Sequence, residues 1–194
     1  MKTDADLVAI ALRGSQEAFR ELVLQFERPV YSLIVRMLQD PAAAEDLAQE
    51  VFLKAYRRLG TYDSSRKFSS WLFKIAHNTT IDYLRRHTLE TVPLEGERPG
   101  EDHGSLAAVL ADGSTEDPAA AAERRDMAKS LERAIARLRA EYRELVVLFY
   151  VEGASYQDLC EATGLPLGTV KTNLHRARKE LAREMTAEGW APSG

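Results

Sequence analysis

Residues 40–60 carry the feature that most limits the fold of this chain. Asp40 and Pro41 form a helix-start signal, because an N-cap side chain precedes a proline at the first helical position. Gly60 marks the end of the same segment. The segment therefore predicts an amphipathic helix, since its apolar residues recur at helical spacing: Ala44, Leu47, Ala48, Val51, Phe52, Ala55, Tyr56 and Leu59.

Similar start and stop signals recur along the chain, whereas strand-like alternation of useful length does not appear. Pro29 lacks a backbone donor, and we expect it to kink or split the helix that contains it. These signals predict an all-α fold. The other predicted helices cover residues 4–13, 15–38, 68–87, 118–138, 140–152, 155–164 and a long segment from 166.

An acidic segment divides the chain. Residues 88–120 contain eight acids and one base, so they carry −7 while the whole chain carries −4. The stretch 88–117 is also rich in proline and glycine, which predicts a flexible linker. We therefore expect two small helical domains, residues 1–87 and 118–187, followed by a tail over 188–194.

Positive charge gathers in two short stretches, 66–86 and 171–183, and each carries a net charge of +4. Local patches of this kind favour a polyanionic partner more than the total charge does. Either patch taken alone is more typical of a solvated helix face. The bases are Arg66, Lys67, Lys74, Arg85 and Arg86 in the first, and Lys171, Arg176, Arg178, Lys179 and Arg183 in the second.

The last helix predicts a DNA reader. A short helix, a turn containing Gly164 and a longer basic helix form the outline of a helix-turn-helix. Val170, Leu174, Ala177 and Leu181 share one face of the last helix. On the opposite face and its edge we predict base contacts from Lys171, Thr172, His175 and Arg176, and phosphate contacts from Arg178 and Lys179. The alternative is an amphipathic surface helix with a coiled-coil or protein-binding role.

Several function classes lack support. The four histidines show no metal-ligand spacing, and no phosphate-binding loop or nucleophile elbow is present, so we predict neither an enzyme nor a metal or cofactor site. No apolar run reaches bilayer length, and the N-terminus does not resemble a signal peptide. The lone Cys160 excludes an internal disulfide and fits a reducing cytoplasm. Cys160 is either a small buried side chain or a redox sensor.

Two sets of residues carry a resemblance to a known family. Residues 166–171, followed by Arg176-Ala177-Arg178 and preceded by Ser155-Tyr156-Gln157-Asp158-Leu159, are similar to region 4 of bacterial sigma factors. Residues 46–56 and 68–78 are similar to region 2. Two such domains joined by a short acidic linker resemble the extracytoplasmic-function group. The resemblance covers roughly residues 6–87 and 118–186.

The resemblance implies a promoter-specificity subunit of bacterial RNA polymerase that an anti-sigma factor holds inactive. Region 2 would bind core polymerase and would recognise and melt the minus-ten element. The last helix would read the minus-thirty-five element as duplex DNA. The alternative is a conventional regulator that binds duplex DNA without polymerase.

The helix predicted at 41–59 has a solvent stripe with one apolar member, Leu53. The resemblance implies that this stripe docks on the clamp helices of the largest catalytic polymerase subunit. An apolar side chain ringed by polar contacts is typical of a binding hot spot. The predicted core-polymerase residues are Asp46, Gln49, Glu50, Leu53 and Arg57.

The helix predicted from Phe68 has an awkward middle, residues 78–82. Continued at helical spacing from Ile75, it would bury Asp82 and turn Ile81 and Leu84 outward. A buried unpaired carboxylate is costly, so we expect a break near Asn78, although a continuous helix with a local partner for Asp82 is the alternative. In the resembled family such a break accepts a flipped base of the single-stranded minus-ten element. The predicted minus-ten residues are Arg66, Lys67, Trp71, Lys74, Asn78, Thr79, Asp82, Arg85 and Arg86.

Overall fold

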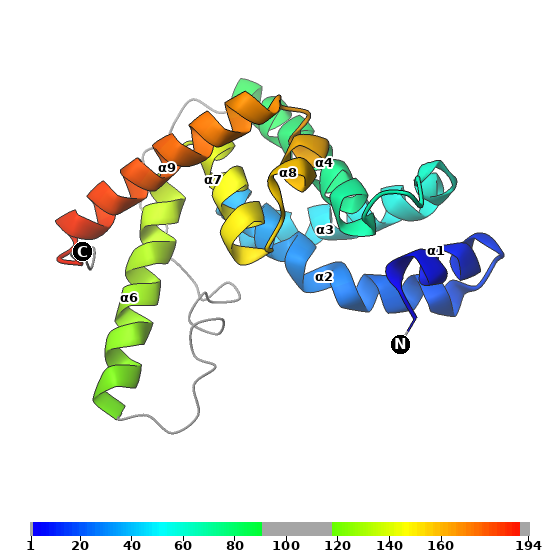
Figure 1. The fold of residues 1–194 in the computed structure, drawn as a ribbon, viewed down its shortest axis with the longest axis horizontal. Coiled ribbons are helices and arrows are strands. Elements are labelled where there is room, and N and C mark those ends of the chain that lie inside the picture. The colour runs from blue at the N-terminus through cyan, green and yellow to red at the C-terminus, as the bar shows by residue number, and fades with distance from the viewer. Residues whose placement is uncertain (1, 91–117, 191–194) are drawn as a thin grey trace.

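The computed structural model describes residues 2–90 and 118–190, and every regular element in these ranges is a helix (Figure 1). The all-α prediction is therefore confirmed. The predicted linker lies outside the described residues except for 88–90, which extend the last helix of the first domain. The first domain contains α1 (Asp4–Leu12), α2 (Gln16–Leu38), α3 (Pro41–Arg58), the 3-10 helix η1 (Leu59–Thr61) and α4 (Phe68–Glu90). The second contains α6 (Pro118–Arg137), α7 (Ala140–Val146), the π-helical turn η2 (Val147–Val151), α8 (Tyr156–Thr163) and α9 (Leu167–Ala187).

Side-chain caps fix where several helices begin, including the cap predicted at Asp40. Asp40 accepts a hydrogen bond from the third residue of α3 at 3.2 Å, and Pro41 occupies the first position. Thr3 and Asp6 form a reciprocal capping box at α1, and Ser155 and Asp158 form another at α8. Each cap satisfies N–H groups that have no partner inside the helix. The local sequence thus sets these boundaries.

Pro29 does not split α2, which runs unbroken from Gln16 to Leu38. The proline removes one backbone hydrogen bond. Phe26, Val30 and Leu33 on either side of it are nonetheless buried in the same core. Burial of these side chains outweighs the missing bond, so of the two expected effects, a kink or a split, the split does not occur.

The helix predicted at 140–152 changes character near its end. Regular α-helix stops at Val146, and η2 follows with a hydrogen bond from the Glu152 N–H to the Val147 carbonyl at 3.1 Å. A π turn holds one more residue than an α turn. It leaves Leu148 fully buried and Tyr150 48% exposed.

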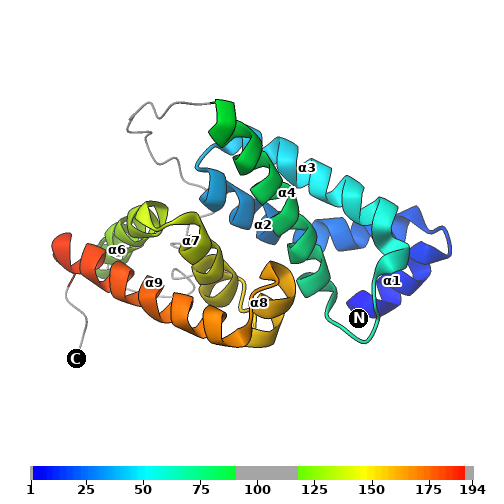
Figure 2. The ribbon, with the colours of Figure 1, turned by 90° about the horizontal axis from the view of Figure 1, so that it is seen from above.

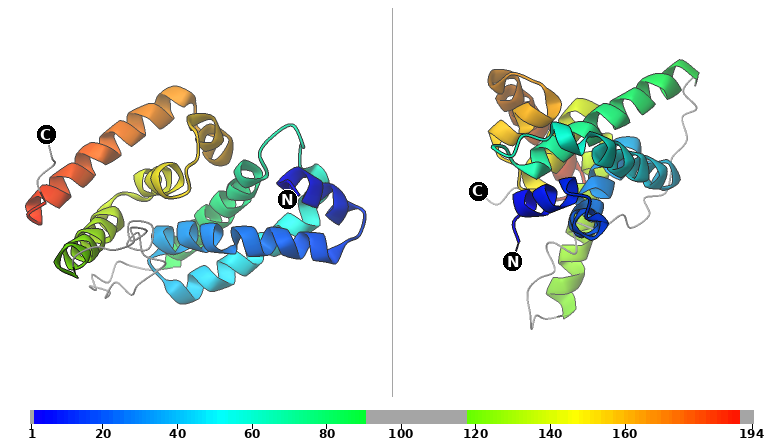
Figure 3. Two further views of the ribbon diagram at one scale, coloured as in Figure 1. Left: turned by 60° about the horizontal axis from the view of Figure 1, so that its bottom comes forward. Right: turned by 90° about the vertical axis from the view of Figure 1, so that its right-hand side faces the viewer.

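The two domains are packed against each other. Helix α8 lies along α4, and α7 lies against α2 (Figures 2 and 3). Buried apolar side chains from both domains form one continuous cluster. The sequence predicts two separate units, and no local pattern marks the packing between them, because the polar contacts of that interface join residues far apart in the chain.

Helix α6 extends away from the body of the molecule, as Figure 1 shows, and its last turns cross α9. Arg133 lies 2.8 Å from Glu188, and Arg137 lies 3.1 Å from Glu184. The hydrogen bond from Arg133 holds the pKa of Glu188 below its usual range. These contacts fix the direction of α9 relative to α6.

Candidate nucleic-acid interface

Helix α9 buries one narrow face and exposes the other. Val170, Leu174 and Ala177 are buried, and Leu181 is half-buried. All six predicted DNA-contacting side chains are exposed: Lys171, Thr172, His175, Arg176, Arg178 and Lys179. The structure therefore brings them together on the outer surface of the second domain.

Thr172 offers its methyl group more readily than its hydroxyl. The Thr172 hydroxyl donates to the Gly168 carbonyl one turn earlier at 2.8 Å. Lys171 leans over the ring of Tyr156 at 5.8 Å, which ties α9 to the start of α8. An exposed Thr methyl suits apolar contact with thymine, and nearby Arg and Lys side chains suit guanine or phosphate.

Helix α4 is continuous through residues 78–82, so the predicted break near Asn78 is wrong. The polar residues in this stretch have partners or reach solvent. Lys54 donates to the Thr79 hydroxyl at 3.1 Å, and the Thr80 hydroxyl donates to the Ala76 carbonyl at 2.8 Å. Asn78 is exposed. The helix tolerates these residues because side-chain hydrogen bonds satisfy their hydroxyl groups.

Asp82 is exposed although it lies on the same side of α4 as the buried Ile75. Helix α4 is buried on two sides in its first half, where α2 and α3 pack from one domain and α8 from the other. Figure 2 shows its C-terminal end projecting past this packing. Ile81 and Leu84 remain half-buried there. The helix can therefore continue without burying the Asp82 carboxylate, because the helices that cover the first half of α4 do not extend to Asp82.

The predicted minus-ten residues fall into three groups. Lys74, Asn78, Asp82, Arg85 and Arg86 are exposed along α4. Thr79 is only 2% exposed and is bonded to Lys54, so its side chain is not part of the surface. Arg66, Lys67 and Trp71 lie at the start of α4, close to the second domain.

A cavity of about 240 Å³ brings three of these residues together between the domains. Trp71, Arg66 and Lys74 line it with Tyr62 from the preceding loop and Glu161 from α8. The Tyr62 and Trp71 rings lie 5.7 Å apart. Aromatic faces beside cations are typical of surfaces that bind single-stranded nucleic acid.

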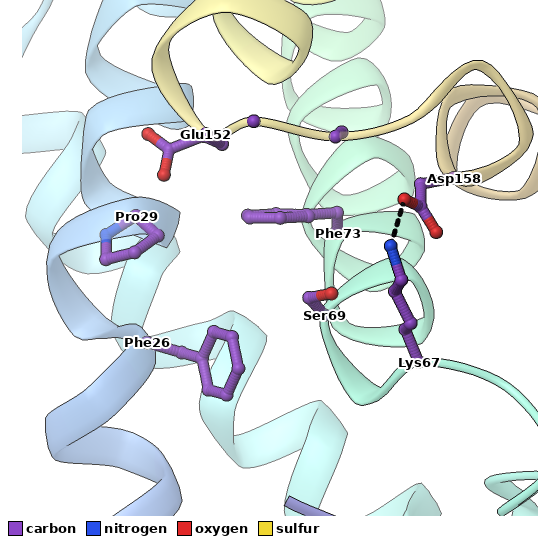
Figure 4. Close-up of a pocket in the computed structure, with 9 residues that line it drawn as sticks. Phe26, Pro29, Lys67, Ser69, Phe73, Glu152 and Asp158 are labelled. Atoms are coloured by element: carbon purple, nitrogen blue, oxygen red, sulfur yellow. Dashed lines mark hydrogen bonds and ion pairs between the residues drawn. The ribbon is translucent and has the colours of Figure 1, made fainter.

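Lys67 and Asp158 form an ion pair across the two domains at 2.7 Å (Figure 4). Asp158 also accepts hydrogen bonds from Ser70 and Ser155. Burial opposes ionisation of Asp158, but these hydrogen bonds outweigh it and hold its pKa well below the usual range. Asp158 therefore stays ionised at neutral pH.

The solvent stripe of α3 is exposed as predicted for Asp46, Gln49, Leu53 and Arg57. Leu53 is 58% exposed. Glu50 is half-buried and lies 2.7 Å from Lys54. Sequence analysis assigns Tyr56 to the buried stripe, yet this side chain is 51% exposed and contacts Phe19 edge to face at 4.9 Å.

Arg143 is a structural residue that sequence reasoning misses. Its buried guanidinium donates to five carbonyls, two at the end of α2 and three around the end of α6. Burial lowers the pKa of Arg143 to about 10. The acceptors are Arg36, Met37, Ile135, Ala136 and Leu138, so one side chain joins the C-terminal ends of two helices from different domains.

A second polar contact joins α4 and α7. His77 Nδ1 lies 2.6 Å from Glu144 Oε1, and Glu144 is buried. No local pattern in the sequence marks either residue as an interdomain partner. The two side chains become partners only because the two domains pack against each other.

Cys160 is half-buried against the apolar core of α8, which favours a packing role. Within residues 2–90 and 118–190, no cluster of His, Cys, Asp and Glu side chains has the makeup of a metal site. In the same ranges no helix combines the length and apolar character required to cross a bilayer.

Comparison with known proteins covers both domains. The family model for Sigma-70 region 2 matches residues 22–90, and that for Sigma-70, region 4 matches residues 128–181. The ECF RNA polymerase sigma factor SigW of Bacillus subtilis is 34% identical over 174 residues, which cover 89% of this chain and 91% of SigW. The RNA polymerase sigma-H factor of Pseudomonas aeruginosa is 32% identical and covers 94% of this chain and 93% of its own length.

A solved structure shares the fold. The sigma factor RpoE from Bartonella quintana, in complex with the anti-sigma factor NepR, matches with a TM-score of 0.65. The match covers 87% of this chain and 96% of RpoE at 21% sequence identity.

Proposed function

This chain belongs to the extracytoplasmic-function group of RNA polymerase sigma factors, and from that premise we propose how its surfaces divide the work of promoter recognition. Its relatives are sigma factors, which are not enzymes. The protein directs promoter-specific initiation as a subunit of RNA polymerase in the cytoplasm. The observation that carries this proposal is the exposed basic face of α9, set on a helix-turn-helix beside a region 2 domain.

Helix α9 reads the minus-thirty-five element in the major groove. Lys171, Thr172, His175 and Arg176 lie nearer the helix N-terminus and contact base edges. Arg178 and Lys179 contact phosphates and set the register of the helix on the duplex.

The first domain binds the melted minus-ten strand along α4. Asn78 and Asp82 lie on the exposed surface of a continuous helix and offer hydrogen bonds to a base edge. Trp71 and Tyr62 offer ring faces at the interdomain cavity. Arg66, Lys67, Lys74, Arg85 and Arg86 hold the phosphates. Asn78→Ala and Asp82→Ala are expected to impair minus-ten selection without loss of core binding.

The stripe on α3 docks on the clamp helices of the largest catalytic subunit, with Leu53 at its centre. Leu53→Asp is expected to weaken core binding by about 30-fold or more, because a hot-spot side chain contributes about 2 kcal/mol. Leu12→Asp is the matched control, since Leu12 is 53% exposed on α1, outside the region 2 match. A pull-down titration with core polymerase separates the two. Equal affinities for both variants would exclude this docking surface.

Regulation by an anti-sigma factor is part of the proposal. The fold neighbour RpoE was solved with such a partner, and the exposed DNA- and polymerase-binding faces offer the surfaces that a partner of this kind covers.

The direct test is in vitro transcription with core polymerase, followed by mapping of start sites on genomic templates. We expect transcripts that begin downstream of a shared pair of promoter elements only when this protein is added. Tight, sequence-specific binding to the same duplex by the protein alone, without stimulated transcription, would indicate a conventional regulator instead.

A further inference from the structure

Two acidic side chains of α8 form ion pairs with basic side chains that directly precede α4. Asp158 Oδ2 is 2.7 Å from Lys67 Nζ, and Asp158 Oδ1 accepts a hydrogen bond from the Ser70 hydroxyl at 2.8 Å. Glu161 lies 3.5 Å from Arg66. These five residues form what is here named the α8 latch, and Figure 4 shows its Lys67–Asp158 pair.

The latch reproduces the bonds of a bound phosphate. An ammonium group, a guanidinium group and a hydroxyl converge on acidic oxygens, which is the donor set that proteins present to nucleic-acid backbones. Only 12% of the Asp158 side chain is exposed, while Lys67 is 64% exposed. The Asp158 carboxylate is thus mostly buried, whereas the Lys67 ammonium group is accessible to a competing anion.

The packed arrangement also prevents the two DNA-reading surfaces from reaching their elements together. The positions for which the minus-ten and minus-thirty-five elements are named differ by about 25 base pairs, which is roughly 85 Å of duplex at about 3.4 Å per base pair. In the closed molecule α8 of the helix-turn-helix touches the start of α4. The 27 residues between α4 and α6 allow separation, since a chain of this length reaches about 90 Å at full extension.

We propose that Asp158 and Glu161 act as an intramolecular substitute for promoter phosphates, so that the free protein masks its own single-strand binding site. This inference rests on the proposed function of the first domain and adds a regulatory contact to it. Separation of the domains removes the two acids from Arg66 and Lys67 and uncovers Ser70, so that all three can bind the melted strand.

The test measures binding of fluorescein-labelled oligo(dT)15 to the full chain by fluorescence anisotropy, without polymerase. The variant Asp158→Asn/Glu161→Gln removes both charges, while the Asn amide oxygen keeps the bond to Ser155 in the capping box. We expect about fivefold tighter binding, because two ion pairs with exposed cations no longer compete. The slope of log K against log salt is expected to steepen by up to about 1.4, as two more phosphate contacts release counterions.

Three controls separate the latch from simpler effects. Glu17→Gln/Glu21→Gln makes the same change in net charge at exposed ion pairs on α2 and is expected to leave oligonucleotide affinity unchanged. Ser155→Ala weakens the cap of α8 but keeps both latch acids, so it too is expected to bind as wild type does. Addition of Arg66→Gln/Lys67→Gln to the latch variant is expected to abolish the gain. Circular dichroism checks that each variant is folded.

The outcomes distinguish the latch from the proposed function. Unchanged affinity of a folded Asp158→Asn/Glu161→Gln variant overturns the latch, as does an equal gain in the Glu17→Gln/Glu21→Gln control. Promoter-specific transcription by wild type with core polymerase, measured in parallel, tests the proposed function independently. Its absence would refute that function even if oligonucleotide binding follows the latch prediction.

Discussion

The two helices that face nucleic acid, α4 and α9, differ in how their buried residues are spread around the helix axis. Helix α9 packs through one face, and its apolar stripe is visible in the sequence. Helix α4 is held by α2 and α3 on one side and by α8 on another, so its buried residues spread around the axis. Helical periodicity therefore identifies a helix with one buried face well, and it misleads for α4, which is covered in its first half but exposed at Asp82.

The largest expected effect comes from replacing Arg143, the side chain that joins α2 of the first domain to α6 of the second. Arg143→Met leaves buried carbonyls at the ends of α2 and α6 without a donor and is expected to lower the free energy of unfolding by about 3 kcal/mol or more. Urea denaturation followed by circular dichroism measures this change. Arg139→Met is the control, because Arg139 is exposed and its guanidinium lies over the Tyr142 ring at the protein surface, so its loss is expected to cost less than about 1 kcal/mol. An equal loss in the free energy of unfolding for the two variants would contradict the role of Arg143 in joining the two domains.

Proline at position 78 tests the continuity of α4 directly. Asn78→Pro is expected to lower stability by about 3 kcal/mol, because it removes a hydrogen bond and clashes inside a helix. Asn78→Ala is expected to raise stability by about 0.5 kcal/mol, since Asn is a poor helix former and the site is exposed. A loop at Asn78 would tolerate proline and gain nothing from alanine. Thermal unfolding of both variants decides between the two structures.

Substitutions on α9 test which of its exposed residues contact bases and which contact phosphates. Arg176→Ala is expected to weaken holoenzyme binding to a mapped promoter by about 1–3 kcal/mol and to relax base preference at one position. Lys179→Ala is expected to weaken binding to all sequences alike and to reduce the salt slope by about 1. Binding to promoter variants across a salt series measures both. Identical selectivity profiles for the two variants would contradict the assignment of bases to the N-terminal part of α9.

The smallest effect concerns Glu152, an acid at the interdomain joint whose side chain accepts from Ser32 at 2.9 Å. Burial raises the pKa of Glu152 above its usual range. Folding therefore favours its protonated form, and this contribution is present at low pH and is lost as pH rises through the folded pKa. Glu152→Gln is expected to raise stability at pH 7.5 by less than about 1 kcal/mol and to have no benefit near pH 4. Urea unfolding at both pH values provides the check, and a gain that grows on acidification would contradict it.

Local sequence determined much of this protein. The caps at Asp40 and Ser155 place the starts of α3 and α8, and the stripe of Val170, Leu174 and Ala177 predicts which face of α9 is exposed. Leu53 stands out on α3 in the sequence and is exposed in the structure. These features depend on hydrogen bonds and side-chain spacing within a few residues, which a linear pattern contains.

Tertiary structure alone decided the rest. Residues 78–82 form helix because Lys54 reaches Thr79 from another helix and because, among residues 2–90 and 118–190, no helix covers Asp82. The engagement of Lys67 by Asp158, 91 positions away in the chain, follows from the packing of the second domain on the first. Such contacts depend on the spatial arrangement of helices, since burial and partner choice are properties of the assembled fold and not of any short segment.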